Sequence, residues 1–96
     1  MANPLRRHPA MPIFQVLGVP QRLVVFQRVA RRPSTATELA RELPIGRTAV
    51  VQHLTVLKGL GLVDATTEGR NRIYRIRVEG LAPLASWLAQ RKSERS

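Results

Sequence analysis

The segment 45-IGRTAVVQHLTVLKGLGLVD-64 constrains the fold more strongly than any other part of the chain. Its apolar residues recur at the spacing of an amphipathic helix, and Gly59 and Gly61 are expected to end that helix. On a helical wheel of about 100° per residue, one broad arc is apolar and is predicted to pack against neighbouring helices. This arc comprises Ala49, Val50, His53, Leu54, Val56, Leu57 and Leu60.

The opposite arc of the same helix carries few charges, which is uncommon for a helix face that meets only water. Small polar side chains would let the helix lie deep in the major groove of DNA, where Gln pairs with adenine and Thr or Val methyl groups contact thymine. An ordinary solvent-exposed face is the alternative interpretation. The predicted reading face consists of Arg47, Thr48, Val51, Gln52, Thr55 and Lys58.

The sequence before this helix predicts two further helices and a tight turn. Pro20 suits the first turn of a helix that ends before Pro33. Thr35 and Glu38 have the spacing of a capping box and open a short helix, which Pro44 ends. The next helix begins after a tight turn of two residues, which is the arrangement of a helix-turn-helix.

Two β-favouring runs, 62-LVDATT-67 and 72-RIYRIRV-78, follow and predict a hairpin with its turn at 68–71. With helices at 11–18 and 80–92, the chain is predicted to be a winged helix-turn-helix of the mainly α (α+β) class, with about five helices and a β-hairpin wing. An arginine-rich wing can enter the minor groove or bind phosphates, and an ordinary charged turn is the alternative. The predicted wing site is Arg70, Asn71, Arg72 and Arg75.

The length of 96 residues predicts one domain at 11–92, between a flexible basic arm at 1–10 and a flexible tail at 93–96. The net charge is +10, and fourteen of the sixteen cationic residues are arginine, whose planar guanidinium fits phosphates and guanine edges. This balance indicates a polyanionic partner, with solubility alone as the alternative.

Several functional classes are disfavoured by the residues that the chain lacks. The absence of cysteine excludes disulfides, thiolate metal sites and thiol redox switching, and it favours a cytoplasmic protein. No apolar run approaches the ~20 residues that a membrane-spanning helix requires, so no membrane partner is expected. The chain has no evident Ser/His/Asp arrangement and no glycine-rich phosphate loop after a strand, which argues against an enzyme.

The segment 35-TATELARELPIGRTAVVQHLTVLKGLGLVDATTEGRNRIYRI-76 resembles the ArsR/SmtB-type winged-helix repressors. The matching features are a capped "ELA" helix, His53-Leu54 and Val56-Leu57 in the next helix, 61-GLV-63 after it, and 68-EGR-70 with Tyr74 in the wing. The stretch 17-LGVPQRLVV-25 also resembles the family pattern, so the similarity covers about residues 11–90.

This resemblance implies a homodimeric transcriptional regulator, usually a repressor, that binds an inverted-repeat operator in double-stranded DNA. The first and last helices of the family usually build the dimer interface, which suits apolar residues that would otherwise lie on the surface of a small domain. The predicted interface consists of Ile13, Phe14, Leu17, Leu84, Trp87 and Leu88. A winged-helix module for protein–protein interaction, with only non-specific nucleic-acid binding, is the alternative function.

Many members of the family sense metals, but this chain departs from two of their site types. The segment 35–43 has no Cys-x-Cys pair, and the last helix, at 81–92, has no carboxylate and histidine pairs. His8 and His53 are the only histidines, and His53 is predicted to be a packed core residue. No metal and no cofactor are therefore expected. The segment 44-PIGRTAV-50, followed by 52-QHL-54, resembles the metal-free branch of the family, and a small-molecule effector is left open.

Overall fold

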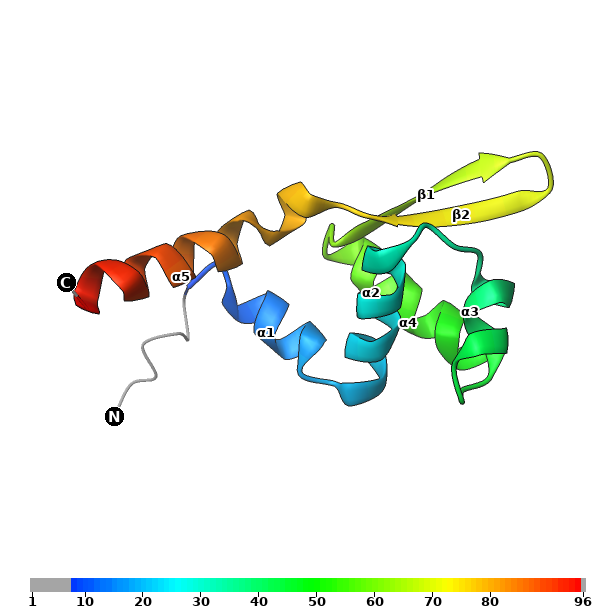
Figure 1. Ribbon diagram of the computed structural model, residues 1–96, viewed down its shortest axis with the longest axis horizontal. Coiled ribbons are helices and arrows are strands. Elements are labelled where there is room, and N and C mark those ends of the chain that lie inside the picture. Colours follow the sequence, from blue (N-terminus) through cyan, green and yellow to red (C-terminus); the bar gives the residue numbers. More distant parts are fainter. Residues whose placement is uncertain (1–7, 96) are drawn as a thin grey trace.

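A computed structural model describes residues 8–95, which form a helical body with a β-hairpin and a C-terminal helix extending from its two ends (Figure 1). The long axis measures 49 Å, against 24 and 20 Å for the other two. The elements in chain order are α1 (Met11–Leu17), α2 (Pro20–Arg31), α3 (Ala36–Glu42), α4 (Arg47–Gly59), β1 (Val63–Glu68), β2 (Asn71–Ile76), the 3-10 helix η1 (Val78–Leu81) and α5 (Ala82–Arg95). This order confirms the predicted winged helix-turn-helix with five helices and a hairpin.

The helix-turn-helix begins and ends where the local sequence chemistry predicts. The capping box at the start of α3 is present: Glu38 N donates to Thr35 Oγ1 at 3.1 Å, and Thr35 N donates to Glu38 Oε1 at 3.2 Å. These two bonds satisfy amides that a helix start otherwise leaves unpaired. Gly46, the second residue of the predicted turn, is the N-cap of α4. The turn between α3 and α4 is therefore short, and it holds the two helices in one fixed arrangement.

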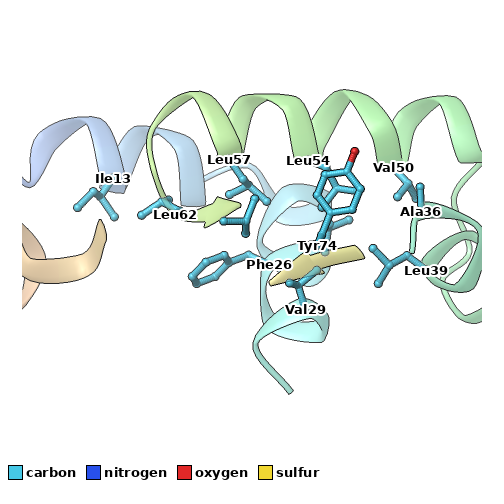
Figure 2. Packing of buried hydrophobic residues seen from close by; sticks show 12 residues of the cluster. Ile13, Phe26, Val29, Ala36, Leu39, Val50, Leu54, Leu57, Leu62 and Tyr74 are labelled. Atoms are coloured by element: carbon cyan, nitrogen blue, oxygen red, sulfur yellow. The ribbon is translucent and has the colours of Figure 1, made fainter. Parts of the chain in front are cut away.

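The core lies between α2 and α4, with α1, α3 and the hairpin closing its sides (Figure 2). Val50, Leu54 and Leu57 recur at helical spacing on α4 and are fully buried. The prediction that these three residues of the apolar arc face the core is therefore confirmed. Val56 differs, because it lies at the edge of that arc and remains 38% exposed. The buried apolar cluster consists of Ile13, Val25, Phe26, Val29, Ala36, Leu39, Val50, Leu54, Leu57, Leu62, Val63 and Tyr74.

Helix α4 ends in a Schellman motif that depends on Gly61. Leu62 N donates to Leu57 O at 2.9 Å, and Gly61 N donates to Lys58 O at 3.0 Å, which are the two bonds that define this motif. Gly61 has a φ of +79°, a left-handed conformation that a residue with a Cβ adopts only with strain. The chain consequently reverses at once and starts β1 next to the end of α4.

The hairpin is a two-stranded antiparallel sheet whose register runs from Val63 opposite Ile76 to Glu68 opposite Asn71. The loop therefore has two residues, Gly69 and Arg70, in place of the four predicted at 68–71. Gly69, with φ +63° at the first loop position, supplies the glycine of a type II′ turn, and this tight turn lets Glu68 and Asn71 remain paired.

A polar cluster, buried at Arg28 and Ser34, joins α2, α3 and the base of the hairpin. Arg28 is only 8% exposed, and its guanidinium donates to both carboxylate oxygens of Glu42, with Nη2 to Oε1 at 2.9 Å. Its Nη1 also donates to Ser34 Oγ at 3.1 Å. Ser34 is fully buried and exchanges two backbone hydrogen bonds with Tyr74 of β2, at 2.9 and 3.1 Å. The hairpin is thus attached to the helical body by main-chain bonds as well as by apolar packing.

The two ends of the chain differ from the predicted boundaries. Helix α5 continues to Arg95, through most of the tail predicted at 93–96, because Lys, Arg and Glu favour helix and no Gly or Pro stops it. At the other end, residues 1–7 of the predicted arm lie outside the described residues, while Ala10 is fully buried at the start of α1. No helix within residues 8–95 is long and apolar enough to cross a membrane.

The Arg28–Glu42 pair gives the fold an acid-sensitive component. The hydrogen bonds from Arg28, together with the charges of Arg28, Arg32 and Arg31, hold the pKa of Glu42 below its ordinary value of 4.5. Because this pKa is lower in the folded state, the stabilisation is complete above the unfolded pKa and is lost as pH falls through the folded pKa.

We predict that Glu42→Gln flattens the acid limb of the stability curve. Urea unfolding over a pH series should show a smaller dependence on pH below about 4.5 in the variant than in the wild type, since the variant has no charge to lose at this position. Glu79→Gln, at an exposed position of η1, is the control and should retain the wild-type acid slope. Equal slopes for wild type and Glu42→Gln would contradict the assignment.

Candidate nucleic-acid interface

The predicted reading face of α4 points away from the core. Because Val50, Leu54 and Leu57 fix the rotation of the helix about its axis, residues on the opposite arc are directed outward. Val51 is half-buried at the margin of this face. The exposed members are Arg47, Thr48, Gln52, Thr55 and Lys58.

Beside this face lies a hollow of about 610 Å³ between the start of α3, the first turns of α4 and the hairpin. Four arginines line it against a single glutamate, so its formal charge is strongly positive. Such a concave basic surface concentrates anions, and guanidinium groups bind phosphate oxygens through paired donors. The lining residues are Thr35, Ala36, Thr37, Glu38, Arg41, Arg47, Val51, Arg70, Asn71, Arg72 and Tyr74.

The hairpin divides the predicted wing residues between two places. Arg70 and Asn71 at the tip and Arg72 on β2 all line the hollow. Arg72 lies over the ring of Tyr74, with its Cζ 5.7 Å from the ring centroid. Successive strand residues point to opposite faces, which places Arg75 on the other face of the hairpin from Arg72.

Arg75 is held by its own hairpin. Its Nη1 donates to Thr66 Oγ1 at 2.7 Å, and its Nη2 donates to Glu68 Oε1 at 3.1 Å. Arg75 is therefore not among the residues that the structure gathers around the hollow, because the alternation of the strand turns it away. Its predicted DNA contact stays a prediction, and two of its five N–H donors are engaged within the hairpin.

Two contacts restrict side chains on the reading face. Thr55 Oγ1 donates to Val51 O at 2.8 Å, so the Thr55 hydroxyl can only accept a further hydrogen bond. Arg47 Nε donates to Thr37 Oγ1 at 3.4 Å and so links the first turn of α4 to α3. Gln52, between these positions, is exposed, and its amide offers both a donor and an acceptor.

Helix α3 contributes residues that the sequence analysis missed. Thr37 and Arg41 lie four residues apart on one face of α3, and both line the hollow. The capping box locates the start of α3 in the sequence. The i, i+4 spacing of Thr37 and Arg41 next to the turn could therefore have indicated that both belong to the interface. The edge of the candidate interface therefore includes α3 as well as α4 and the hairpin.

His53 lies on the inward side of α4 but is only half-buried. Its Nε2 is 3.3 Å from Gln21 Oε1 of α2, so it joins the two central helices. Burial, followed by the positive charge of Arg22, lowers the pKa of His53 below its ordinary 6.5. The ring is consequently neutral at neutral pH and adds no charge to the interface. His53 therefore packs on the inward side of α4 as predicted, but it is not one of the buried residues of the core.

The predicted dimer residues fall into four groups. Ile13 is 2% exposed and packs into the core of its own chain. Its predicted position in the dimer interface is therefore wrong, because α1 directs this side chain inward, where a partner cannot reach it. Phe14 and Trp87 form an edge-to-face pair, with ring centroids 5.3 Å apart, that joins α1 to α5. Leu17 and Leu84 are half-buried. Leu88 is 49% exposed and presents an apolar side chain to the outside.

The chain matches a family model described as "Helix-turn-helix domain" over residues 13–65. It is 42% identical over 71 residues to HTH-type transcriptional regulator Rv2034 of Mycobacterium tuberculosis, and the match covers 74% of this chain and 66% of that protein. This chain thus spans slightly less than two thirds of that relative.

Solved structures show the same fold. An ArsR-like transcriptional regulator from Rhodococcus sp. RHA1 superimposes with a TM-score of 0.80 at 29% identity, covering 90% of this chain and 81% of that one. The homodimeric winged helix-turn-helix DNA-binding domain Mb0332 from Mycobacterium bovis superimposes with a TM-score of 0.69 at 25% identity, covering 91% and 81%.

Proposed function

Because the chain belongs to the ArsR-type family of winged helix-turn-helix transcriptional regulators, we propose that it binds an inverted-repeat operator in double-stranded DNA as a homodimer and represses transcription. The observation that carries the proposal is the continuity between the low-charge face of α4 and the arginine-lined hollow beside it. The first surface suits base edges, and the second suits the sugar–phosphate backbone.

In this mode α4 enters the major groove with its exposed face toward the bases. Gln52 is proposed to pair with adenine, while Thr48 and Val51 contact thymine methyl groups. Lys58, at the far end of α4, is proposed to contact the DNA backbone. Arg70 and Arg72 would hold the phosphates that flank the groove, or reach the adjacent minor groove from the hairpin tip.

The homodimer is proposed from the apolar surface of α1 and α5. Phe14, Trp87 and Leu88 lie at least partly open to solvent on these helices, where the residues of a small monomer are usually polar. The likeness to a homodimeric domain supports this assembly. Two-fold symmetry would present two α4 helices to successive major grooves on one side of the duplex, which is why the proposed operator is an inverted repeat.

Repression and metal independence rest on different grounds. Repression follows from the resemblance to the ArsR/SmtB-type repressors. Metal independence is supported by the complete absence of cysteine from the chain, since thiolates are the ligands of one of the family's site types. The proposed regulator accordingly uses no metal and no cofactor, and operator affinity measured after chelator treatment should be unchanged when Zn²⁺ or Ni²⁺ is added back.

The first prediction concerns base recognition. Gln52→Ala should weaken binding to the selected operator by about 1–3 kcal/mol and relax the base preference at one position, because a bidentate contact is lost. Fluorescence anisotropy with the operator and with single-base variants measures both effects. Gln27→Ala removes the same side chain from an exposed position of α2 and should leave both unchanged. Unchanged operator affinity in Gln52→Ala would show that the reading face is misassigned.

The second prediction separates the two faces of the hairpin. Arg72→Ala should weaken binding to all DNA sequences alike and lower the slope of log K against log salt by about one, because one phosphate contact disappears. Arg75→Ala should change the slope less, since Arg75 is paired with Glu68 on the opposite face. A wild-type slope near zero would instead favour the protein–protein interaction module.

The third prediction concerns assembly. Leu88→Glu should dissociate the dimer without unfolding the chain, because it places a charge in the proposed interface and leaves the Phe14–Trp87 pair intact. Gln90→Glu makes the same change of charge at an exposed position of the same helix and is the control. Analytical ultracentrifugation gives the mass, and circular dichroism checks the fold. A fully dimeric Leu88→Glu protein would contradict this interface.

A further inference from the structure

Two glycines bring the end of α4 into direct backbone contact with η1, the 3-10 helix that leads into α5. Gly80 in η1 lies against Gly61, the residue that closes the Schellman motif of α4. A Cβ added to Gly80 would overlap the carbonyl oxygen of Gly61, and it would lie 2.8 Å from the Gly61 carbonyl carbon and 3.3 Å from Leu62 Cα. No other residue type fits this contact without a shift of the backbone.

Hydrogen bonds fix both sides of this contact. Arg77 N donates to Leu62 O at 2.8 Å, which ties the residue before η1 to the residue after Gly61. Gly80 N donates to Arg77 O at 3.0 Å and closes the 3-10 turn. The side chain of Arg77 also covers Gly61, with its Nη1 3.5 Å from the position of a Cβ there. The direction in which η1 leaves the body is therefore set by main-chain geometry.

Beyond this contact, apolar side chains of η1 and α5 meet the body. Leu81 and Leu84 pack at the edge of the core, and Trp87 meets Phe14 of α1. The helix then continues to Arg95 along the far end of the molecule from the hairpin (Figure 1). Its orientation relative to α4 consequently depends on the Gly61–Gly80 contact at its beginning as well as on the Phe14–Trp87 pair.

We propose that Gly61 and Gly80 form a joint that fixes the angle between the DNA-reading helix α4 and the dimerisation helix α5, and that this angle sets the half-site spacing which the dimer accepts. The inference rests on the proposed function. Both glycines are positioning residues, since neither lines the hollow nor lies on the reading face of α4.

The length of α5 supports this role. Helix α5 has 14 residues, which corresponds to a length of about 21 Å at 1.5 Å per residue. A rotation of about 10° at one end of such a helix moves the other end by about 3.7 Å, which is comparable to the rise of about 3.4 Å for one base pair. A change in the joint too small to unfold the domain would therefore move the end of the proposed dimerisation helix by a distance comparable to one base pair.

The test is in vitro selection from a random duplex library with the full chain, comparing wild type and Gly80→Ala. The half-site sequence should be the same for both, because the reading face of α4 is unchanged, while the spacing between half-sites should shift or broaden. On the wild-type operator, Gly80→Ala should lose about tenfold or more in affinity, since both half-sites can no longer be engaged together. Its affinity for a single half-site should stay close to that of wild type.

Gly59→Ala is the matched control, because a Cβ at Gly59 meets nothing within 4 Å. It should retain the wild-type spacing. If Gly80→Ala does not fold, Glu79→Gly and Glu79→Ala provide a second test at an exposed position of η1. The glycine loosens the backbone next to the joint and should broaden the accepted spacing, whereas the alanine removes the same charge without loosening it.

The outcomes separate the two proposals. A wild-type protein that selects no paired half-sites would overturn the proposed function and this inference with it. A wild-type protein that selects paired half-sites, with an identical spacing preference in Gly80→Ala or in Glu79→Gly, would overturn the joint alone. A changed half-site sequence with unchanged spacing would also overturn it, because the glycines would then act on the reading face.

Discussion

The burial of one arc of α4 against α2 is the constraint on which the rest of the structure depends. Val50, Leu54 and Leu57 lose all contact with solvent, which contributes roughly 1.5–3 kcal/mol for each side chain. The same packing prevents α4 from rotating about its axis. A helix whose rotation is fixed presents one defined set of side chains to the outside, so the core that stabilises the domain also determines which residues can meet a ligand.

The positive charge of the candidate interface depends on where the few acidic residues lie in the fold. Glu38 closes the capping box, Glu42 binds Arg28, and Glu68 binds Arg75. Three acidic residues in the described part of the chain are thus engaged in contacts within the fold. Glu38 alone offsets the four arginines of the hollow. The positive potential of that surface therefore results from the internal use of the carboxylates as well as from the number of arginines.

Features determined by local chemistry were predictable, and features determined by the approach of distant segments were not. The capping box, the start of α4 and the hairpin follow from residues close together in sequence, and the structure has all three. The inward position of Ile13 depends on how α1 meets the core, and the contact of Gly80 with Gly61 depends on how the chain returns to α4. Arg41 and Arg72 line the same hollow only because α3 lies next to β2. Periodicity in the sequence does not predict which elements lie next to each other.

The backbone pairing of Ser34 with Tyr74 has a consequence for how the hairpin is aligned. A two-stranded ribbon is by itself only marginally stable, and sliding one strand by a single residue would exchange its two faces. Such slippage would turn Arg72 outward and bring Arg75 inward. Ser34 forms its two backbone hydrogen bonds with Tyr74 on the edge of β2 that does not pair with β1. These bonds fix the position of β2 and so oppose the slippage. A buried serine outside the hairpin thereby decides which arginines a bound polyanion encounters.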